Sequence, residues 1–136
     1  HRLPKVNHPV YYGGPVLTNV VGVLHSTDYV LHSTNTLTED KVGFTLDRQM
    51  LEAIAKGQGP KNKLITLGMA NWTTGQLEEE LEHPRNPAMS WLIMDYDEKF
   101  VFGQLDDDKS DDLWERCVSQ AIRRKTKEIT SKVFKD

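Results

Sequence analysis

The sequence contains little cysteine and no long apolar run, and both absences narrow the class of protein. Cys117 is the single cysteine among 136 residues, so these residues can form neither an internal disulfide nor a thiolate zinc site. One thiol fits a reducing compartment, and we expect a cytoplasmic location. No window approaches the roughly 18 apolar residues that cross a bilayer, and residues 1–5 are not followed by a signal-peptide core. We therefore expect no membrane partner.

Patterns that carry catalysis or cofactor binding are missing as well. The chain contains neither G-x-G-x-x-G nor G-x-x-x-x-G-K-[S/T], the glycine patterns of nucleotide-binding loops. Ser26 and Ser33 each follow a histidine, but adjacent side chains on a strand point to opposite faces, so neither pair forms a catalytic dyad. Cys117 falls on the apolar side of an expected helix, as an inert thiol would. We therefore favour a non-enzymatic protein with no cofactor and no metal.

Short β-prone runs come first in the chain, and helices are interspersed among them. The runs that we expect to form strands are residues 10–12, 20–24, 29–32, 41–46, 63–68, 90–94 and 99–102. Residues 63–68 are apolar on both faces, which places them inside a sheet rather than at its edge. Polar or glycine-containing turns separate the strands. This order predicts an α+β fold, and the chain length predicts one domain over residues 1–136.

Capping residues mark the expected helices. Asp47 opens a helix that carries Met50, Leu51, Ile54 and Ala55 on one face and stops at Gly57. Thr73 and Gln76 have capping-box spacing, and the helix that they open runs to about residue 82 with Leu77 and Leu81 facing the core. Residues 106–108 lead into Ser110 as the cap of the last helix. The apolar positions of that helix are Leu113, Trp114, Cys117, Val118, Ala121, Ile122 and Ile129.

The charges are unevenly distributed along the second half of the chain. Residues 95–115 contain nine acids and two bases, whereas residues 123–136 contain six bases and two acids. From about residue 123 we expect a basic helical extension that projects into solvent or onto a partner; its bases include Arg123, Arg124, Lys125 and Lys127. The acidic and basic regions either pair with each other within the chain, bind a charged partner or serve only as solvated surface.

Two segments occur in a distinctive order and resemble a known family. The first is PVYYGGPV at residues 9–16, followed by GVLHS at residues 22–26. The second is LGMANWTTGQLEEEL at residues 67–81, followed by Trp91 and by FVF at residues 100–102. In this order they resemble the YqgE/AlgH family of small bacterial proteins over roughly residues 9–114.

The resemblance implies a curved mixed or antiparallel sheet with flanking helices, and no agreed biochemical activity. One branch of the family is labelled a transcriptional regulator of exopolysaccharide synthesis, although this chain has no DNA-binding motif. The sequence departs from the family pattern in four places: few residues precede Pro9, Val20-Val21 replaces an arginine, Asn71 replaces a small residue, and the tail is basic. We expect the missing N-terminal strands to leave sheet edges exposed, which favours a homo-oligomer or docking onto another protein.

Two groups of residues are candidate binding positions. The junction that follows the strand at residues 63–68 contributes Trp72, Gly75, Gln76, Glu79 and Glu80, where an exposed tryptophan could anchor a protein partner; Gln76 could instead serve only the capping box. The second group is Gly13, Gly14 and His25, which could bind an anion, although two glycines before Pro15 are as well explained by a tight turn.

The function that we expect is a regulatory module that acts by contact with an unidentified protein. The alternatives are a small-molecule or anion-binding enzyme that uses Gly13, Gly14 and His25, and a DNA-binding regulator that uses the basic extension. Nucleic-acid binding is the weaker alternative, because no aromatic residues interleave with the bases of the tail and the chain is acidic overall, with a net charge of −3.

Overall fold

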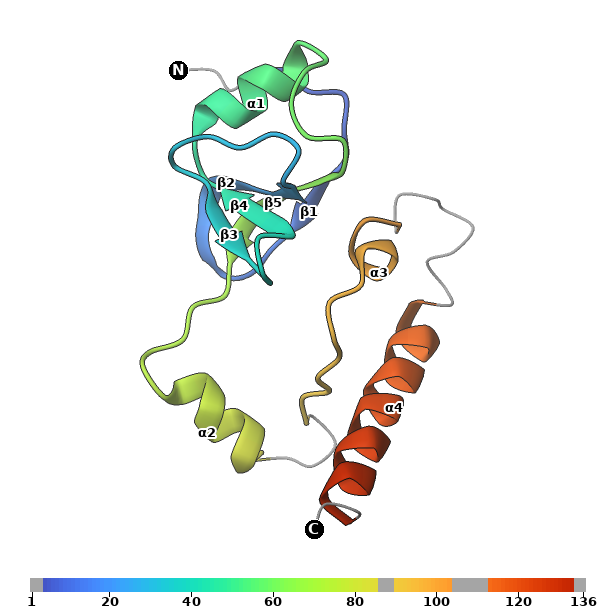
Figure 1. Ribbon diagram of the computed structural model, residues 1–136. Coiled ribbons are helices and arrows are strands. Elements are labelled where there is room, and N and C mark those ends of the chain that lie inside the picture. Colours follow the sequence, from blue (N-terminus) through green and yellow to red (C-terminus); the bar gives the residue numbers. More distant parts are fainter. Residues whose placement is uncertain (1–3, 86–89, 104–112, 134–136) are drawn as a thin grey trace. The chain divides into compact units, whose positions relative to one another are not determined.

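The computed structural model describes residues 4–85, 90–103 and 113–133 (Figure 1). The chain divides into two compact units, His1–Asn71 and Trp72–Asp136, which we call the N-terminal unit and the C-terminal unit. The N-terminal unit holds a sheet and one helix, and the described part of the C-terminal unit is helical or irregular. The α+β fold class is confirmed, and the assignment of residues 1–136 to one domain stays a prediction.

A five-stranded mixed sheet forms the N-terminal unit, in the order β1-β5-β2-β4-β3. Its strands are β1 (Val10–Tyr12), β2 (Val16–Ser26), β3 (Asn35–Leu37), β4 (Val42–Thr45) and β5 (Lys63–Met69). The β1 and β5 strands are parallel, and the remaining pairs are antiparallel. β5 lies between β1 and β2, so the prediction of an interior strand at residues 63–68 is confirmed.

Helix α1 (Arg48–Ala55) lies beside the sheet of this unit (Figure 1) and contributes three of the five residues in its buried cluster. Asp47 caps it as predicted, because its carboxylate accepts a hydrogen bond from the Gln49 amide at 2.9 Å. Its apolar side chains pack with those of the sheet in one buried cluster: Val23, Met50, Leu51, Ile54 and Ile65. Ala53 is buried and Ala55 is exposed, contrary to the prediction, because Ala53 follows Met50 by three residues and shares its face. Gly57 ends the helix at φ 74°.

The strand predicted at residues 29–32 is wrong. Tyr29 and Leu31 pack against the core cluster from a loop, so their apolar character reflects burial without strand pairing. The Thr34 amide donates to the Leu31 carbonyl at 3.0 Å, which closes a turn. The third strand, β3, instead begins at Asn35, in one of the polar stretches that we expected to be turns between strands, and it forms one of the two edges of the sheet.

Two further strand predictions fail in the C-terminal unit. Residues 90–94 have no regular secondary structure, and residues 99–102 belong to α3 (Glu98–Phe102). Asp97 caps α3 by accepting hydrogen bonds from the amides of Lys99 and Phe100 at 2.8 and 3.3 Å. The β-prone apolar run FVF was consistent with a strand, and the competing signal was Asp97, a good N-cap residue in front of it.

Helix α2 (Gln76–Glu82) begins later than predicted and does not contribute to a core. Its N-cap is Gly75, at φ 82°, and not Thr73. None of its residues is buried, and Leu81 is 37% exposed, so the expected inward face of Leu77 and Leu81 is absent.

The long last helix is confirmed as α4 (Leu113–Val133), but its apolar stripe divides. Ala121 is buried, whereas Trp114, Ile122 and Ile129 are 69%, 58% and 55% exposed. The predicted cap at residues 106–110 lies outside the described residues. Among the described residues, no helix combines the length and the apolar character that crossing a bilayer requires.

Candidate functional site

The predicted junction residues surround the start of α2 in the C-terminal unit. Gly75 adopts a left-handed conformation that favours glycine, and the space around its missing Cβ is empty. The Gln76 carboxamide oxygen accepts hydrogen bonds from the Thr73 amide at 3.0 Å and from the Thr73 hydroxyl at 3.2 Å. These contacts join the turn before α2 to its first residue, although Thr73 is not the N-cap, so Gln76 has a structural role and also stands at the surface.

Two tryptophans converge on one glutamate beside this turn. The indole N–H groups of Trp72 and Trp91 donate to the same Oε2 atom of Glu80, at 3.3 and 3.1 Å. The two rings meet edge to face, with centroids 5.8 Å apart and planes at 65°. Trp72 is 37% exposed and Trp91 is 49% exposed. We call these three residues the tryptophan–glutamate cluster.

Trp91 was missed as a site residue, although the family resemblance already included it. The available sequence signal was the tryptophan itself, because large aromatic side chains are frequent in protein interfaces. The strand expected at residues 90–94 hid that signal, because a strand would have turned Trp91 toward a sheet face. In the irregular segment that the structure shows, the ring instead reaches Glu80, eleven residues earlier in the chain.

A cavity of about 530 Å³ lies next to the cluster. Its walls are Gln76, Glu79, Glu80, His83, Pro84, Arg85 and Trp91. Three of the predicted junction residues, Gln76, Glu79 and Glu80, are therefore brought together around one hollow. The Glu79 carboxylate lies 3.4 Å from His83 Nδ1, one helical turn away. The volume is within the range of ligand pockets.

Gly13 and Gly14 serve a close approach of backbones in the N-terminal unit. A Cβ atom on Gly13 would stand 2.2 Å from the Gly68 carbonyl oxygen, and one on Gly14 would stand 2.3 Å from the Met69 carbonyl carbon. The Gly13 amide donates to the Leu67 carbonyl at 2.7 Å. Since that donor is engaged and Pro15 has none, this turn offers an anion few amides.

His25 lies on β2 with its side chain 0% exposed. Its Nδ1 atom lies 2.8 Å from the Ser26 carbonyl oxygen, and its Nε2 atom lies 2.8 Å from Thr45 Oγ1. Thr45 Oγ1 lies 2.7 Å from Thr34 Oγ1, which in turn accepts from the Leu31 amide at 2.9 Å. The carbonyl can only accept, so Nδ1 carries the proton, and in the neutral ring each hydroxyl donates onward toward Nε2. His25 is thereby satisfied inside the unit and does not face a ligand.

Asp28 closes the same end of the sheet just outside the core. Its carboxylate accepts from the Ser26 hydroxyl at 2.5 Å and from the Lys61 amide at 3.0 Å. The hydrogen bond from Ser26 is the main cause that lowers the pKa of Asp28 below the usual 3.8. These hydrogen bonds join the loop after β2 to the loop before β5. We call Ser26, Asp28 and Lys61 the clamp, and its role is structural.

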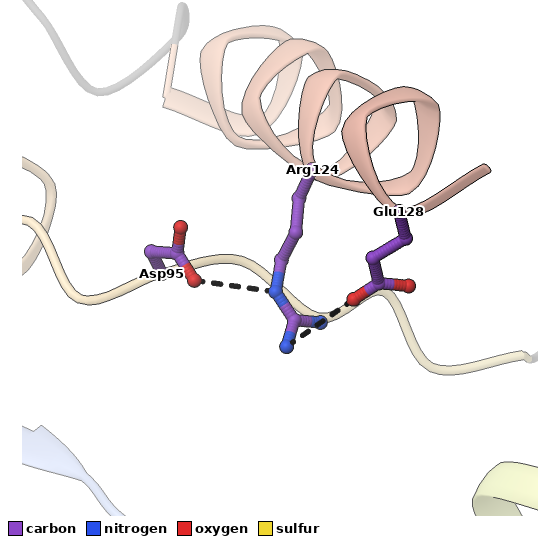
Figure 2. Close-up of polar contacts among 3 residues, drawn as sticks. All are labelled: Asp95, Arg124 and Glu128. Carbon is purple, nitrogen blue, oxygen red and sulfur yellow. Dashed lines mark hydrogen bonds and ion pairs between the residues drawn. The ribbon is translucent and has the colours of Figure 1, made fainter. Parts of the chain in front are cut away.

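The basic tail makes an ion-pair contact within the C-terminal unit (Figure 2). Arg124 projects from α4 between two carboxylates, with Nε 3.2 Å from Asp95 and Nη2 3.6 Å from Glu128. The pair with Asp95 is one instance of the predicted match between the acidic and basic regions. Arg123, Lys125 and Lys127, the other predicted bases, have exposed side chains on the same helix.

The same part of α4 borders a cavity of about 430 Å³, in which Tyr96 lies between acidic neighbours. Burial, followed by the charges of Glu98 and Asp97, raises the pKa of Tyr96 above 10.0. Both acidic and basic side chains line this cavity, so its charge favours neither an anionic nor a cationic ligand. Among the described residues, no group of three His, Cys, Asp or Glu side chains is placed to hold a metal ion.

Comparison with known proteins assigns the family. An AlgH-like family model matches residues 1–124. The chain belongs to the AlgH-like family. It is 43% identical over 102 residues to a UPF0301 protein of Bradyrhizobium sp., an alignment that covers 75% of this chain and 45% of that protein. It is 41% identical over 99 residues to a UPF0301 protein of Pseudomonas putida, which covers 73% and 49%.

A solved structure supports the same assignment. The AlgH protein from Pseudomonas aeruginosa matches with a TM-score of 0.50 and 38% identity, over 61% of this chain and 46% of that chain. The family resemblance is thus confirmed. The chain spans about half the length of the AlgH-like relatives that it matches.

Proposed function

We propose that this AlgH-like chain is a non-enzymatic interaction module that binds a protein partner through the tryptophan–glutamate cluster. The observation that carries the proposal is the pair of partly exposed indoles held together by Glu80 beside a cavity. Tryptophans of this kind are frequent anchors in protein interfaces, because a rigid ring buries a large area at a small entropic cost. The hydrogen bonds to Glu80 orient both rings before a partner arrives, which lowers the cost of ordering them.

The alternatives receive less support from the geometry. An anion or small-molecule site at Gly13, Gly14 and His25 would need accessible donors, yet the Gly13 amide is engaged and His25 is buried with both ring nitrogens bonded. A DNA-binding role for the tail would need several bases directed toward phosphate groups. Arg123, Lys125 and Lys127 are exposed, but Arg124 between them contacts Asp95 and Glu128, which places negative charge beside this row. A location in the reducing cytoplasm remains part of the proposal, on the single thiol of Cys117.

Quantitative affinity capture tests the proposal with the wild type, Trp72→Ala and Trp114→Ala. Trp114 is the matched control, because it is an exposed tryptophan of the same unit that lies outside the cluster. We expect at least one partner protein, once purified, to bind Trp72→Ala about tenfold more weakly than the wild type, a loss of about 1.4 kcal/mol. The same partner should bind Trp114→Ala as tightly as the wild type. Circular dichroism must show that both variants keep the fold.

Light scattering on the same samples decides whether the partner is a second copy. The edge strand β1 pairs within the described residues with β5 alone, and Tyr12 on it is 75% exposed, so self-association has a surface available. A native mass that is a multiple of 15.6 kDa and that Trp72→Ala reduces would identify a homo-oligomer. Equal behaviour of all three proteins, with no partner affected by Trp72→Ala, would reject the cluster as a binding site.

A further inference from the structure

The cavity beside the tryptophan–glutamate cluster has a chemistry that specifies what kind of group it receives. Trp91 lines the cavity and already donates its indole N–H group to Glu80, so it presents ring surface to an incoming group and no further donor. The carboxylates of Glu79 and Glu80 supply acceptors on the same wall. Aromatic surface combined with acceptors suits a ligand that is rich in donors and carries positive charge.

The negative charge of helix α2 also favours a cationic ligand. It carries Glu78, Glu79, Glu80 and Glu82 within seven residues and no base. Within the described part of the chain, the ion pair of this group joins Glu79 to His83, a side chain that is charged only when protonated. Arg85 also lines the cavity, so the walls carry two carboxylates against one guanidinium. An anionic group would meet an excess of negative charge there, whereas a cation would meet attraction.

We propose that this cavity binds an arginine or lysine side chain of the protein partner, with the ring of Trp91 and the carboxylates of Glu79 and Glu80 as its contacts. The inference rests on the proposed function and adds the chemistry of the partner. A guanidinium matches the site well, since it stacks on aromatic rings and pairs with carboxylates at the same time. The partner segment is therefore basic, and its binding weakens as salt concentration rises.

Fluorescence titration of the full chain with short peptides tests the inference. A Trp114→Phe background leaves Trp72 and Trp91 as the emitting residues, and both belong to the cluster. The probe is a capped peptide with one arginine among serines and glycines, and its control carries citrulline, which keeps the shape and removes the charge. We expect the arginine peptide to bind at least about tenfold more tightly than the citrulline peptide, as one charge-assisted contact can supply.

Three substitutions in the same background assign the effect to the cavity. Glu80→Gln keeps an oxygen that can accept from both indoles and removes the charge, so it should weaken the arginine peptide by about tenfold. Arg85→Gln removes the competing cation and should strengthen binding by about twofold to threefold. Glu82→Gln is the matched control, because it removes the same charge from α2 at a position that does not line the cavity; it should change affinity less than about twofold.

Several results would overturn the inference: no change in emission at millimolar arginine peptide, equal affinity for the citrulline peptide, or equal losses in Glu80→Gln and Glu82→Gln. A partner that depends on Trp72 in affinity capture, combined with any of these results, would keep the proposed function and reject the cationic ligand. Peptide binding with the expected pattern, without any Trp72-dependent partner, would keep the cation site and reject the interaction module as stated.

Discussion

The two units of this chain differ in how much apolar core they form from their own side chains. The N-terminal unit packs a buried cluster around Met50 between α1 and the sheet. It also exposes large apolar side chains, on its edge strands, its loops and the start of β2: Val10, Tyr11, Tyr12, Val16, Leu17, Val30, Leu37 and Leu46. Among its described residues, the C-terminal unit buries Phe102 and Ala121, and it exposes a similar set of large apolar side chains: Trp72, Leu81, Trp91, Leu92, Ile93, Trp114, Ile122 and Ile129. Since stabilisation grows with the apolar area removed from water, the first unit gains most from its own core. The second unit forms less core of its own, so burial of its exposed side chains by a partner would add proportionally more to its stability.

Polar groups show the same difference. His25, Thr45 and Thr34 form a hydrogen-bonded chain inside the N-terminal unit, where every unsatisfied group would be costly. In the C-terminal unit the polar contacts of Glu80 and Arg124 are made by partly exposed groups, and such contacts contribute little to stability. They orient side chains at the surface. Specific polar contacts therefore stabilise the fold in one unit and arrange a surface in the other.

The largest expected effect comes from two glycines with similar backbones in different units. Gly68 has φ 77° and Gly75 has φ 82°, but a Cβ on Gly68 would stand 2.3 Å from the Gly14 carbonyl oxygen, whereas a Cβ on Gly75 would meet empty space. Gly68→Ala should lower the free energy of unfolding by about 3 kcal/mol, from left-handed strain and overlap together, and Gly75→Ala by about 1 kcal/mol from strain alone. Urea denaturation measures both. Equal losses would mean that β5 is packed no more tightly than the start of α2.

A smaller effect is expected from the buried hydroxyl of Thr45. Thr45→Val keeps the shape of the side chain and removes the link between His25 and Thr34, so His25 Nε2 loses its donor. The expected loss in the free energy of unfolding is about 2 kcal/mol, because a buried polar atom is left unsatisfied.

Thr126→Val is the matched control for this prediction. The Thr126 hydroxyl on α4 also makes one hydrogen bond, to the Ile122 carbonyl at 3.0 Å, but it is exposed and water can replace that bond. Its loss should be below about 0.5 kcal/mol. A loss in Thr45→Val as small as that in the control would show that the histidine network does not stabilise the N-terminal unit.

The same contrast explains which features could be predicted from sequence. The cap at Asp47, the stop at Gly57 and the interior strand β5 follow from local rules, and all three are observed. The segments at residues 29–32 and 90–94 were misassigned, because an apolar run indicates burial or contact and does not specify strand pairing. The proposal of His25 as an anion ligand is not supported, because its side chain is bonded inside the unit. Its partner Thr45 is brought to it by the pairing of β2 with β4, which no local sequence pattern encodes.

The candidate surface was predictable only in part, for a similar reason. Trp72, Gln76, Glu79 and Glu80 lie within nine residues, and the strand-to-helix junction drew attention to them. Trp91 joins them across a segment with no regular structure, so neither period nor spacing relates it to Glu80. Without Trp91 the junction shows a single anchor residue, and the pairing of the two rings and the place of Trp91 in the cavity wall are visible only in the structure.

The smallest expected effect is on the pH dependence of stability, and its sign differs between the units. In the N-terminal unit the folded state lowers the pKa of Asp28 below 3.8, so this carboxylate stabilises the fold above pH 3.8 and ceases to do so as pH falls through its folded pKa. In the C-terminal unit the pKa of Tyr96 is raised above 10.0, so its contribution is complete below pH 10.0 and is lost as pH rises through the folded value.

Urea denaturation as a function of pH separates the two contributions. Asp28→Asn should flatten the decline of stability on the acid side and leave the alkaline side unchanged, and Tyr96→Phe should do the reverse. The Asp28 effect should stay small, because its carboxylate is exposed and solvent weakens its interactions. If Asp28→Asn left the acid decline as steep as in the wild type, the clamp of Ser26, Asp28 and Lys61 would not be formed in solution. The N-terminal unit would then be held together by its apolar core, without the electrostatic support that the structure shows at the edge of that core.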